Sequence, residues 1–368
     1  MTKDKGQRTL LNFLICLGAI FLAFVNPAFS QSGRVKPSET PTPTPRPRVI
    51  SAPSGIDSEI KVEKIKATPT PTPTPKNNDE EDVIKVESNL VPIPVSVTDF
   101  QGRAVTNLKL EDFELQIDSK TEDISEISLS KTPVRLALLF DNSSSVLQAR
   151  DFEKKAAIRF FKQVIHPEKD QVALFSVASV ARLEQPLTKN IPQLIQAIEL
   201  FSKPEGATAL LDGIIDAAKY LRDYEGRRVI VIVSDGEDTL SDSTFEDTVK
   251  AIQAYNCQVY VVKTTDFENM VRTGSRLGNA NIRALTAERR MQDITQQTGG
   301  TVYSPIDEDE LNKAFTRISA ELSEQYILSY YPDNESELRG NFRTISLKVK
   351  NRQNLTVRTR KGYFVPKR

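Results

Sequence analysis

The sequence predicts an α/β fold with a doubly wound, mostly parallel sheet, joined by a small β-rich domain built from both ends of the chain. Near-continuous apolar runs, such as VRLALLF at 134–140 and RRVIVIV at 227–233, are typical of parallel strands covered on both faces. Helical patterns alternate with such runs between about 132 and 322, as in doubly wound sheets. Alternating apolar and polar residues on either side of this centre predict half-buried strands.

The composition limits the classes of function. At 368 residues the chain is long enough for one sizeable domain and an accessory one. Its 49 basic and 49 acidic residues cancel, so no overall field indicates nucleic acid as a partner. His166 is the single histidine, which leaves little room for a histidine triad, a histidine-rich zinc site or a histidine base.

The N-terminal residues 1–30 have the order of a secretory signal peptide. Three basic residues precede the apolar stretch 10–25, and the small-residue segment 28–30 offers a cleavage point before Gln31. The apolar stretch is shorter than the roughly 20 residues of a spanning helix, although an uncleaved anchor remains the alternative. We therefore expect an exported protein in the periplasm, the cell envelope or the extracellular space, with possible envelope or membrane association through this segment.

A linker is predicted at 31–82. Its Thr-Pro repeats cannot form helices or sheet ladders and favour extended polyproline II. We interpret it as a spacer, with a docking motif for a proline-binding partner as the alternative. Because Cys16 lies in the signal peptide, Cys257 would be the one cysteine left after cleavage, and we expect it to be a small core residue without a disulfide.

The remaining chain divides into a central α/β domain at 132–322 and β-rich flanks at 83–131 and 323–368. The two flanks are expected to pack together. The predicted central strands lie at 134–141, 170–177, 227–236, 257–264 and 300–306. The predicted central helices lie at 151–165, 191–201, 207–221, 243–255, 284–300 and 309–322.

The segment 264–285 is long for a loop in such a fold. It follows a predicted strand whose carboxyl end is directed toward the edge of the sheet where ligands bind. Long insertions of this kind are usually functional or disordered. We expect it to line one wall of a ligand surface.

Oxygen-bearing side chains collect where the central strands end. DNSSS stands at the end of the first strand, GAT places Thr208 in a Gly-containing loop just before a helix, and SDG ends the strand that starts at 227. These loops place five oxygen donors above one edge of the sheet: Asp141, Ser143, Ser145, Thr208 and Asp235. Hard ions such as Mg²⁺ choose oxygen ligands and keep several waters. The set predicts a metal site with a position left for an incoming group.

A simpler interpretation exists for each motif alone. Asp, Asn and Ser are preferred helix N-cap residues, so DNSSS could be only the start of a helix. SDG is a common turn between a strand and a helix. The site could also be intact and serve only to brace the loops. We expect Asn142 and Ser144 to be the residues for which the cap interpretation holds, and Asp212, Glu237 and Asp238 to be solvated or capping residues.

The three motifs together resemble the metal-ion-dependent adhesion site (MIDAS) of von Willebrand factor type A (vWA) domains. DNSSS fits the DxSxS element, GAT supplies the loop threonine and SDGED the later aspartate. The flanks are similar to those of secreted bacterial proteins with this domain. The resemblance implies a Rossmann-like sheet, Mg²⁺ or Mn²⁺, and a ligand acid that completes the coordination. It implies direct contacts to the ion from Ser143 and Ser145, contact from Thr208 directly or through water, and mainly water-mediated contacts from Asp141 and Asp235.

The function predicted from these features is a non-enzymatic, metal-dependent adhesion-type module that binds an acidic group of a partner protein. No positioned base or nucleophile accompanies the oxygen donors. Two alternatives remain: an envelope structural or assembly protein whose metal only stabilises the fold, and a metal-assisted hydrolase that uses a bound water.

Overall fold

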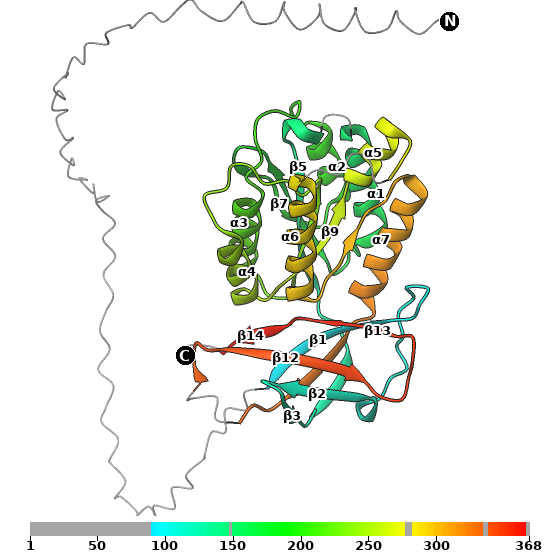
Figure 1. Ribbon diagram of the computed structural model, residues 1–368, viewed down its shortest axis with the longest axis vertical. Coiled ribbons are helices and arrows are strands. Elements are labelled where there is room, and N and C mark those ends of the chain that lie inside the picture. Colours follow the sequence, from blue (N-terminus) through cyan, green and yellow to red (C-terminus); the bar gives the residue numbers. More distant parts are fainter. Residues whose placement is uncertain (1–89, 147–148, 277–281, 334–337, 366–368) are drawn as a thin grey trace, which may run out of the picture. The chain divides into compact units, whose positions relative to one another are not determined.

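The computed structural model describes residues 90–146, 149–276, 282–333 and 338–365; the predicted signal peptide and linker lie outside them. A six-stranded sheet forms the centre, with the order β10-β9-β8-β5-β6-β7 (Figure 1). Its strands are β5 (Val134–Asp141), β6 (Gln171–Val177), β7 (Ala181–Thr188), β8 (Arg227–Ser234), β9 (Cys257–Lys263) and β10 (Val302–Tyr303). Every neighbouring pair is parallel except β6 and β7, so the predicted doubly wound, mostly parallel sheet is confirmed.

Helices cover both faces of this sheet because successive strand residues point to opposite sides. Leu136, Leu138 and Phe140 pack in one core with α1, α2 and α7, whereas Ala137 and Leu139 pack in a second core with α3, α4 and α6. The helices are α1 (Arg150–Val164), α2 (Ile191–Glu199), α3 (Leu210–Arg222), α4 (Phe245–Ala254), α5 (Thr265–Thr273), α6 (Ile282–Thr298) and α7 (Glu308–Ser323). Among the described helices, none is long and apolar enough to cross a membrane.

One strand and one α-helix of the central domain were not predicted. β7 pairs antiparallel with β6 at the edge of the sheet, and its largely exposed residues lack the apolar run of a buried strand. Pro186 lies in this strand, at an edge position where a missing N–H is tolerated. The other is α5, which occupies much of the segment predicted as a long loop. Gly274 ends this helix in the left-handed conformation, and its N–H donates to the Met270 carbonyl oxygen at 2.9 Å.

The flanks form two four-stranded antiparallel sheets, with the orders β13-β1-β11-β4 and β14-β12-β2-β3. N-terminal β1 pairs with C-terminal β11, and N-terminal β2 with C-terminal β12, so the expected pairing of the two flanks is confirmed. The N-terminal strands are β1 (Val91–Thr98), β2 (Phe113–Ile117), β3 (Lys120–Glu122) and β4 (Glu126–Leu129). The C-terminal strands are β11 (Tyr326–Tyr330), β12 (Phe342–Val349), β13 (Thr356–Thr359) and β14 (Gly362–Phe364). Their inward residues share one apolar core.

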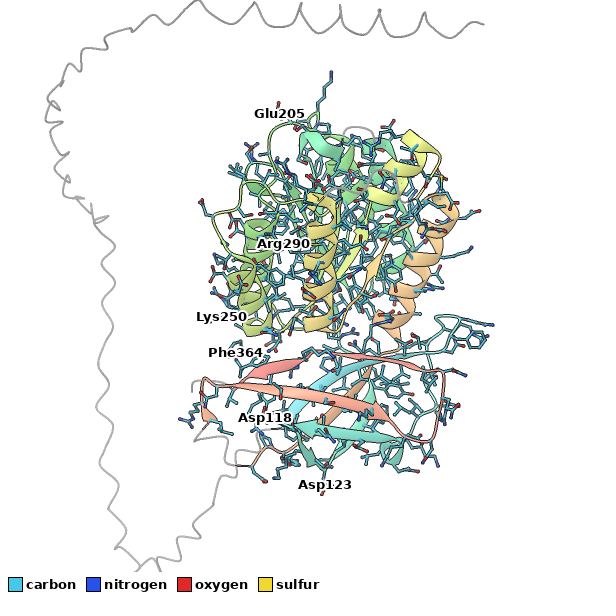
Figure 2. The ribbon with its side chains drawn as sticks, in the orientation of Figure 1. Asp118, Asp123, Glu205, Lys250, Arg290 and Phe364 are labelled. Atoms are coloured by element: carbon cyan, nitrogen blue, oxygen red, sulfur yellow. The ribbon has the colours of Figure 1, made fainter. Side chains whose placement is uncertain are left out.

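A buried carboxylate joins the central domain to these sheets. Glu321 of α7 is 2% exposed and accepts hydrogen bonds from the hydroxyls of Tyr260 and Tyr303, each at 3.1 Å. Arg358 of β13 forms an ion pair with the same carboxylate. Figure 2 shows Asp123 of the β-rich domain at the opposite end of the molecule from Glu205. The end near Glu205 is where the candidate site lies.

Candidate metal centre

Asp141 is the last residue of β5 and is 1% exposed. Its Oδ1 accepts a hydrogen bond from the backbone N–H of Ser143 at 2.9 Å. Its Oδ2 accepts one from the hydroxyl of Ser234, at the end of the neighbouring strand β8, at 2.5 Å. The carboxylate is therefore fixed at the carboxyl edge of the sheet, between its own loop and the end of β8.

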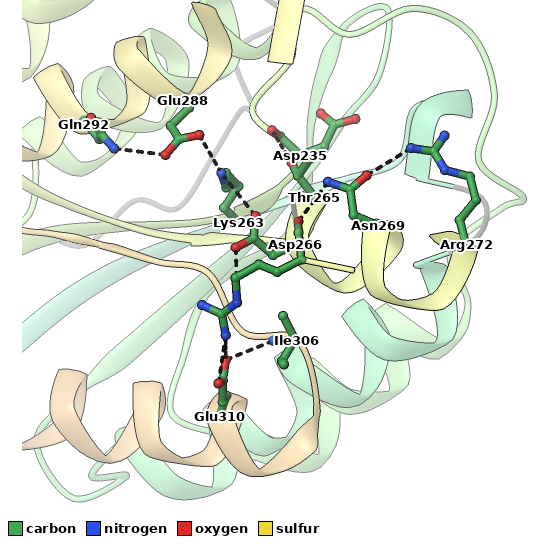
Figure 3. Close-up of polar contacts among 11 residues, drawn as sticks. Asp235, Lys263, Thr265, Asp266, Asn269, Arg272, Glu288, Gln292, Ile306 and Glu310 are labelled. Atoms are coloured by element: carbon green, nitrogen blue, oxygen red, sulfur yellow. Dashed lines mark hydrogen bonds and ion pairs between the residues drawn. The ribbon is translucent and has the colours of Figure 1, made fainter. Parts of the chain in front are cut away.

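Asp235 directly follows β8 and repeats this arrangement. It is 7% exposed, and its Oδ1 accepts a hydrogen bond from the Glu237 N–H at 2.8 Å, two residues along the chain. Its carbonyl oxygen accepts a hydrogen bond at 3.1 Å from the hydroxyl of Thr265, the first residue of α5 (Figure 3). Both aspartates thus end parallel strands in tight, hydrogen-bonded turns.

Thr208 lies in the loop before α3 and is 3% exposed. Its N–H donates to the hydroxyl of Thr239 at 3.0 Å, and its carbonyl oxygen accepts from the N–H groups of Thr239 and Leu240 at 2.8 and 3.0 Å. The loop after β8 also caps α3, because the Asp238 carboxylate accepts from the Leu210 N–H at 2.8 Å. The structure therefore joins the loops of Thr208 and Asp235, and Asp238 is a capping residue as expected.

The residues that follow Asp141 also contact the loop that contains Thr208. Ser143 is 1% exposed, and Ser145 lies in the short 3-10 helix η2 (Ser144–Val146). The Ser144 hydroxyl donates to the carbonyl oxygen of Gly206 at 2.8 Å, and the Asn142 carbonyl oxygen accepts from the Glu205 N–H at 3.0 Å. Asp141, Thr208 and Asp235 thus stand on three mutually hydrogen-bonded loops.

The expectation that Asn142 and Ser144 cap the following helix is wrong. α1 begins at Arg150, and its N-cap residue is Ala149, which makes no side-chain cap bond. The turn η2 and the residues after it separate the serines from α1, so their side chains are too far along the chain to reach its free N–H groups. Asn142 and Ser144 instead join the loop of Asp141 to the residues before Thr208.

Burial and mutual repulsion dominate the electrostatics of the site. Burial, and then the nearby Asp235 carboxylate, raise the pKa of Asp141 to about 7. Burial and Asp235 also raise the pKa of Glu237. The guanidinium of Arg150 lies over the Phe140 ring at 4.7 Å and donates to the carbonyl oxygen of Asp141 at 3.3 Å, rather than to its carboxylate. The two aspartates therefore share an environment in which a bound cation would relieve their repulsion.

The donor chemistry of these residues fits a hard divalent ion. The predicted set offers carboxylate and hydroxyl oxygens, which Mg²⁺ and Mn²⁺ accept. The described part of the chain contains no group of three or more His, Cys, Asp and Glu side chains suited to hold one ion, so binding here would depend on the hydroxyls. Cys257 is buried in the core, where burial raises the pKa of its thiol to about 12. His166 lies after α1, with Nε2 3.2 Å from the Ser323 hydroxyl.

The sequence interpretation missed three residues close to the site. Ser234 holds Asp141 in place, and its position before Asp235 could have suggested such a role. Glu153 is fully buried in α1, four residues before Ala157 and eight before Phe161, both of which are also buried. That spacing places a carboxylate on the buried face of the helix. Thr264, fully buried after β9, has no comparable signal.

Comparison with known proteins gave a family match and similarities to solved structures. Residues 136–237 match the family model of the von Willebrand factor type A domain, a segment that includes Asp141, Thr208 and Asp235. No match was found among curated proteins. An aerotolerance-related membrane protein from Bacteroides fragilis is 22% identical, with a TM-score of 0.40, over 51% of this chain and 98% of that protein.

Two further solved structures are similar at lower identity or over a smaller share of the matched protein. BatB of Bacteroides thetaiotaomicron is 21% identical, with a TM-score of 0.39, over 51% of this chain and 98% of that one. The PilB minor pilin of Streptococcus sanguinis is 14% identical, with a TM-score of 0.40, over 53% of this chain and 62% of that one. The family match is thus to the von Willebrand factor type A domain, and it lies within the six-stranded, mostly parallel sheet.

Proposed function

We propose that this chain is a non-enzymatic protein-binding module that holds Mg²⁺ or Mn²⁺ at the carboxyl edge of its parallel sheet. Ser143 and Ser145 would bind the ion directly, with Thr208 direct or through water. Asp141 and Asp235 would hold its waters. The remaining coordination position would accept a carboxylate of a partner protein.

The observation that supports this proposal is the hydrogen-bonded assembly of three loops around two buried aspartates. Thr239 connects the Asp235 loop to Thr208, and Ser144 connects the Asp141 loop to Gly206. Ligands held by mutually bonded loops need little reorganisation when an ion binds, which favours affinity. The repulsion between Asp141 and Asp235 gives a cation an electrostatic gain at this position.

Metal binding is tested by titration calorimetry of the full chain with MgCl₂ and MnCl₂. We expect saturable binding in the wild-type protein and its loss in Asp141→Ala. The matched control is Asp212→Asn, because Asp212 accepts hydrogen bonds from Asp242 and Ser243 N–H groups, at 2.9 and 3.0 Å, in the neighbouring loop. Equal Mg²⁺ affinity in Asp141→Ala and the wild type would contradict the proposal.

Partner binding requires a second measurement. The immobilised full chain is exposed to an envelope extract in Mg²⁺ or in EDTA, and captured proteins are retested individually with Asp141→Ala. We expect that capture requires both the metal and Asp141. A high concentration of free acetate should weaken it. Binding that persists in EDTA would exclude an adhesion-type role. A rise of the melting temperature with Mg²⁺ and no partner would favour the structural alternative.

We also propose that the protein is exported and that residues 31–82 separate the folded domains from the membrane or the cell wall. The basic, apolar and small-residue order of 1–30 supports this proposal. N-terminal sequencing of the protein recovered from each cell fraction tests it. We expect a mature chain that begins near Gln31; a full-length chain in the cytoplasm would contradict export.

A further inference from the structure

Close to Asp141 and Asp235, the first turn of α1 meets α5 around a group of buried oxygens. Ten buried side-chain nitrogen and oxygen atoms of the described residues lack a hydrogen-bond partner. Four of these ten belong to three neighbouring residues: both carboxylate oxygens of Glu153, Oγ1 of Thr264 and Oε1 of Glu268. Buried polar groups are nearly always bonded, so this concentration requires an explanation.

The three residues are held together by packing. The ring of Phe152, next to Glu153, stacks on that of Phe267, next to Glu268, with centroids 3.8 Å apart and planes 8° from parallel. The Glu268 N–H donates to the carbonyl oxygen of Thr264 at 3.1 Å, which places the two residues one helical turn apart on the same face. The Thr264 hydroxyl lies close enough to Glu153 to lower the pKa of that carboxyl, although the geometry of this contact falls short of a hydrogen bond.

The surrounding charge is negative. Glu153 is repelled by Asp141, by Glu268 and by Asp235. Such buried carboxylates are costly unless a proton, a basic side chain or a metal ion compensates them.

The basic side chains around this group bond elsewhere. Arg150 donates to the backbone oxygens of Asp141 and Ser202 at 3.3 and 3.2 Å. Arg272 donates to the Asn269 side-chain oxygen at 2.9 Å (Figure 3).

Lys263, at the end of β9, is also committed to other partners. Its Nζ pairs with Glu288 at 3.1 Å and with Asp266 at 3.5 Å, as Figure 3 shows. Arg150 and Arg272 still lie close enough to attract Glu153 and Glu268, respectively, through space. Neither forms an ion pair with them, so both carboxylates stay uncompensated by direct contact.

We propose that Glu153, Thr264 and Glu268 form an inner site for a hard divalent cation, separate from the outer site of Asp141 and the hydroxyls. The four unpartnered oxygens are the ligand type that Mg²⁺ and Ca²⁺ prefer, and waters complete the coordination. The inner site uses two carboxylates and a hydroxyl, in keeping with the lack of any three-member His, Cys, Asp and Glu group among the described residues. Burial first, and neighbouring carboxylates second, raise the pKa of Glu268 to about 8 and that of Glu153 well above its ordinary value. A bound cation would replace those protons.

Metal stoichiometry tests the inner site. The full chain is dialysed to equilibrium against saturating MgCl₂ or CaCl₂, and bound metal per chain is measured by mass spectrometry. We expect two ions in the wild type, one in Glu153→Gln and one in Glu268→Gln. Asp151→Asn is the matched control, because this exposed carboxylate stands on the same turn of α1, and it should retain two. Circular dichroism checks folding, and Glu268→Gln decides the matter if Glu153→Gln does not fold.

The double variant Ser143→Ala/Thr208→Ala separates this inference from the proposed function. It should lose the outer ion and keep the inner one. A single ion in the wild type, retained in Glu153→Gln and lost in the double variant, would overturn the inner site and leave the outer site standing. A single ion in the wild type that is lost in Glu153→Gln and retained in the double variant would support the inner site and contradict the outer one. A chain that binds no metal would overturn both.

Discussion

Two buried acidic regions at opposite ends of the α/β domain differ in how their charges are compensated. At the junction with the antiparallel sheets, Glu321 accepts hydrogen bonds from two tyrosines and pairs with Arg358. At the opposite end, Asp141 is bonded to neutral groups, and the carboxylate oxygens of Glu153 have no hydrogen-bond partner among the described residues. The protein supplies a cationic donor to Glu321 at the junction, whereas the two donors to Asp141 at the carboxyl edge of the sheet are neutral.

This difference distinguishes a structural carboxylate from one suited to a ligand. A buried carboxylate with a full set of protein donors stabilises one arrangement of the chain, and removing it leaves the donors unpaired. A buried carboxylate without a cation has unfavourable energy that an incoming ion can relieve. Substitutions at the two ends should therefore change stability in opposite directions when no metal is present.

The largest expected effect is at the junction. Glu321→Ala leaves Arg358 and the hydroxyls of Tyr260 and Tyr303 without their shared acceptor, and we expect a loss of about 3–5 kcal/mol in the free energy of unfolding. Because the chain has no tryptophan, urea unfolding is followed by far-ultraviolet circular dichroism. Glu321→Gln keeps an acceptor and should cost less. If Glu321→Ala lowered the free energy of unfolding by less than the substitution of an exposed residue does, the junction would not need this carboxylate.

At the other end, Asp141→Asn should abolish metal binding and leave the metal-free protein no less stable. The amide removes the repulsion from Asp235 and keeps an oxygen for the Ser143 N–H. We expect a change between zero and a gain of about 1 kcal/mol in EDTA, within the range of ordinary substitutions. The measurement is urea unfolding in EDTA and in Mg²⁺. A large loss of stability in EDTA would show that Asp141 is a structural residue, as Glu321 is.

The pH dependence should also distinguish the two ends. In EDTA, Glu268 has a pKa of about 8 in the folded chain against 4.5 for the ordinary group, so the folded state binds more protons between these values. The contribution of this group is therefore complete below about pH 4.5 and falls as the pH rises toward 8. Glu268→Gln should make the fall of the unfolding free energy with pH shallower, by a slope that corresponds to at most about one proton. Mg²⁺ should make it shallower too. An unchanged slope in Glu268→Gln would contradict this assignment.

The fold could be predicted where local patterns match the final environment. β8 is a continuous apolar run because both of its faces are covered, and the run stops where the polar edge begins at Asp235. β7 escaped prediction because an edge strand has one open side and needs no apolar run. α5 escaped prediction because the length of its segment indicates an inserted loop, although Gly274 marks the end of a helix.

The residues of the candidate site also divide into those that local patterns predict and those that depend on packing. Asp141 and Asp235 follow recognisable strands, and so their common edge could be inferred from the parallel topology. Glu153 and Thr264 are more than 100 residues apart and meet only because α1 packs on α5. Their contact depends on side-chain packing, which no short motif contains. Ser145 and the ion itself remain predictions from sequence.

The smallest expected effect tests whether burial, rather than charge pairing, decides how much a carboxylate contributes to stability. Arg276 donates to both carboxylate oxygens of Glu310, at 2.8 and 2.6 Å. Their side chains are 45% and 37% exposed, however, so water already solvates both charges. Glu310→Gln should therefore cost at most about 1 kcal/mol, measured by urea unfolding beside Glu321→Gln. Equal costs in these two variants would show that solvent exposure does not decide the value of a carboxylate in this protein.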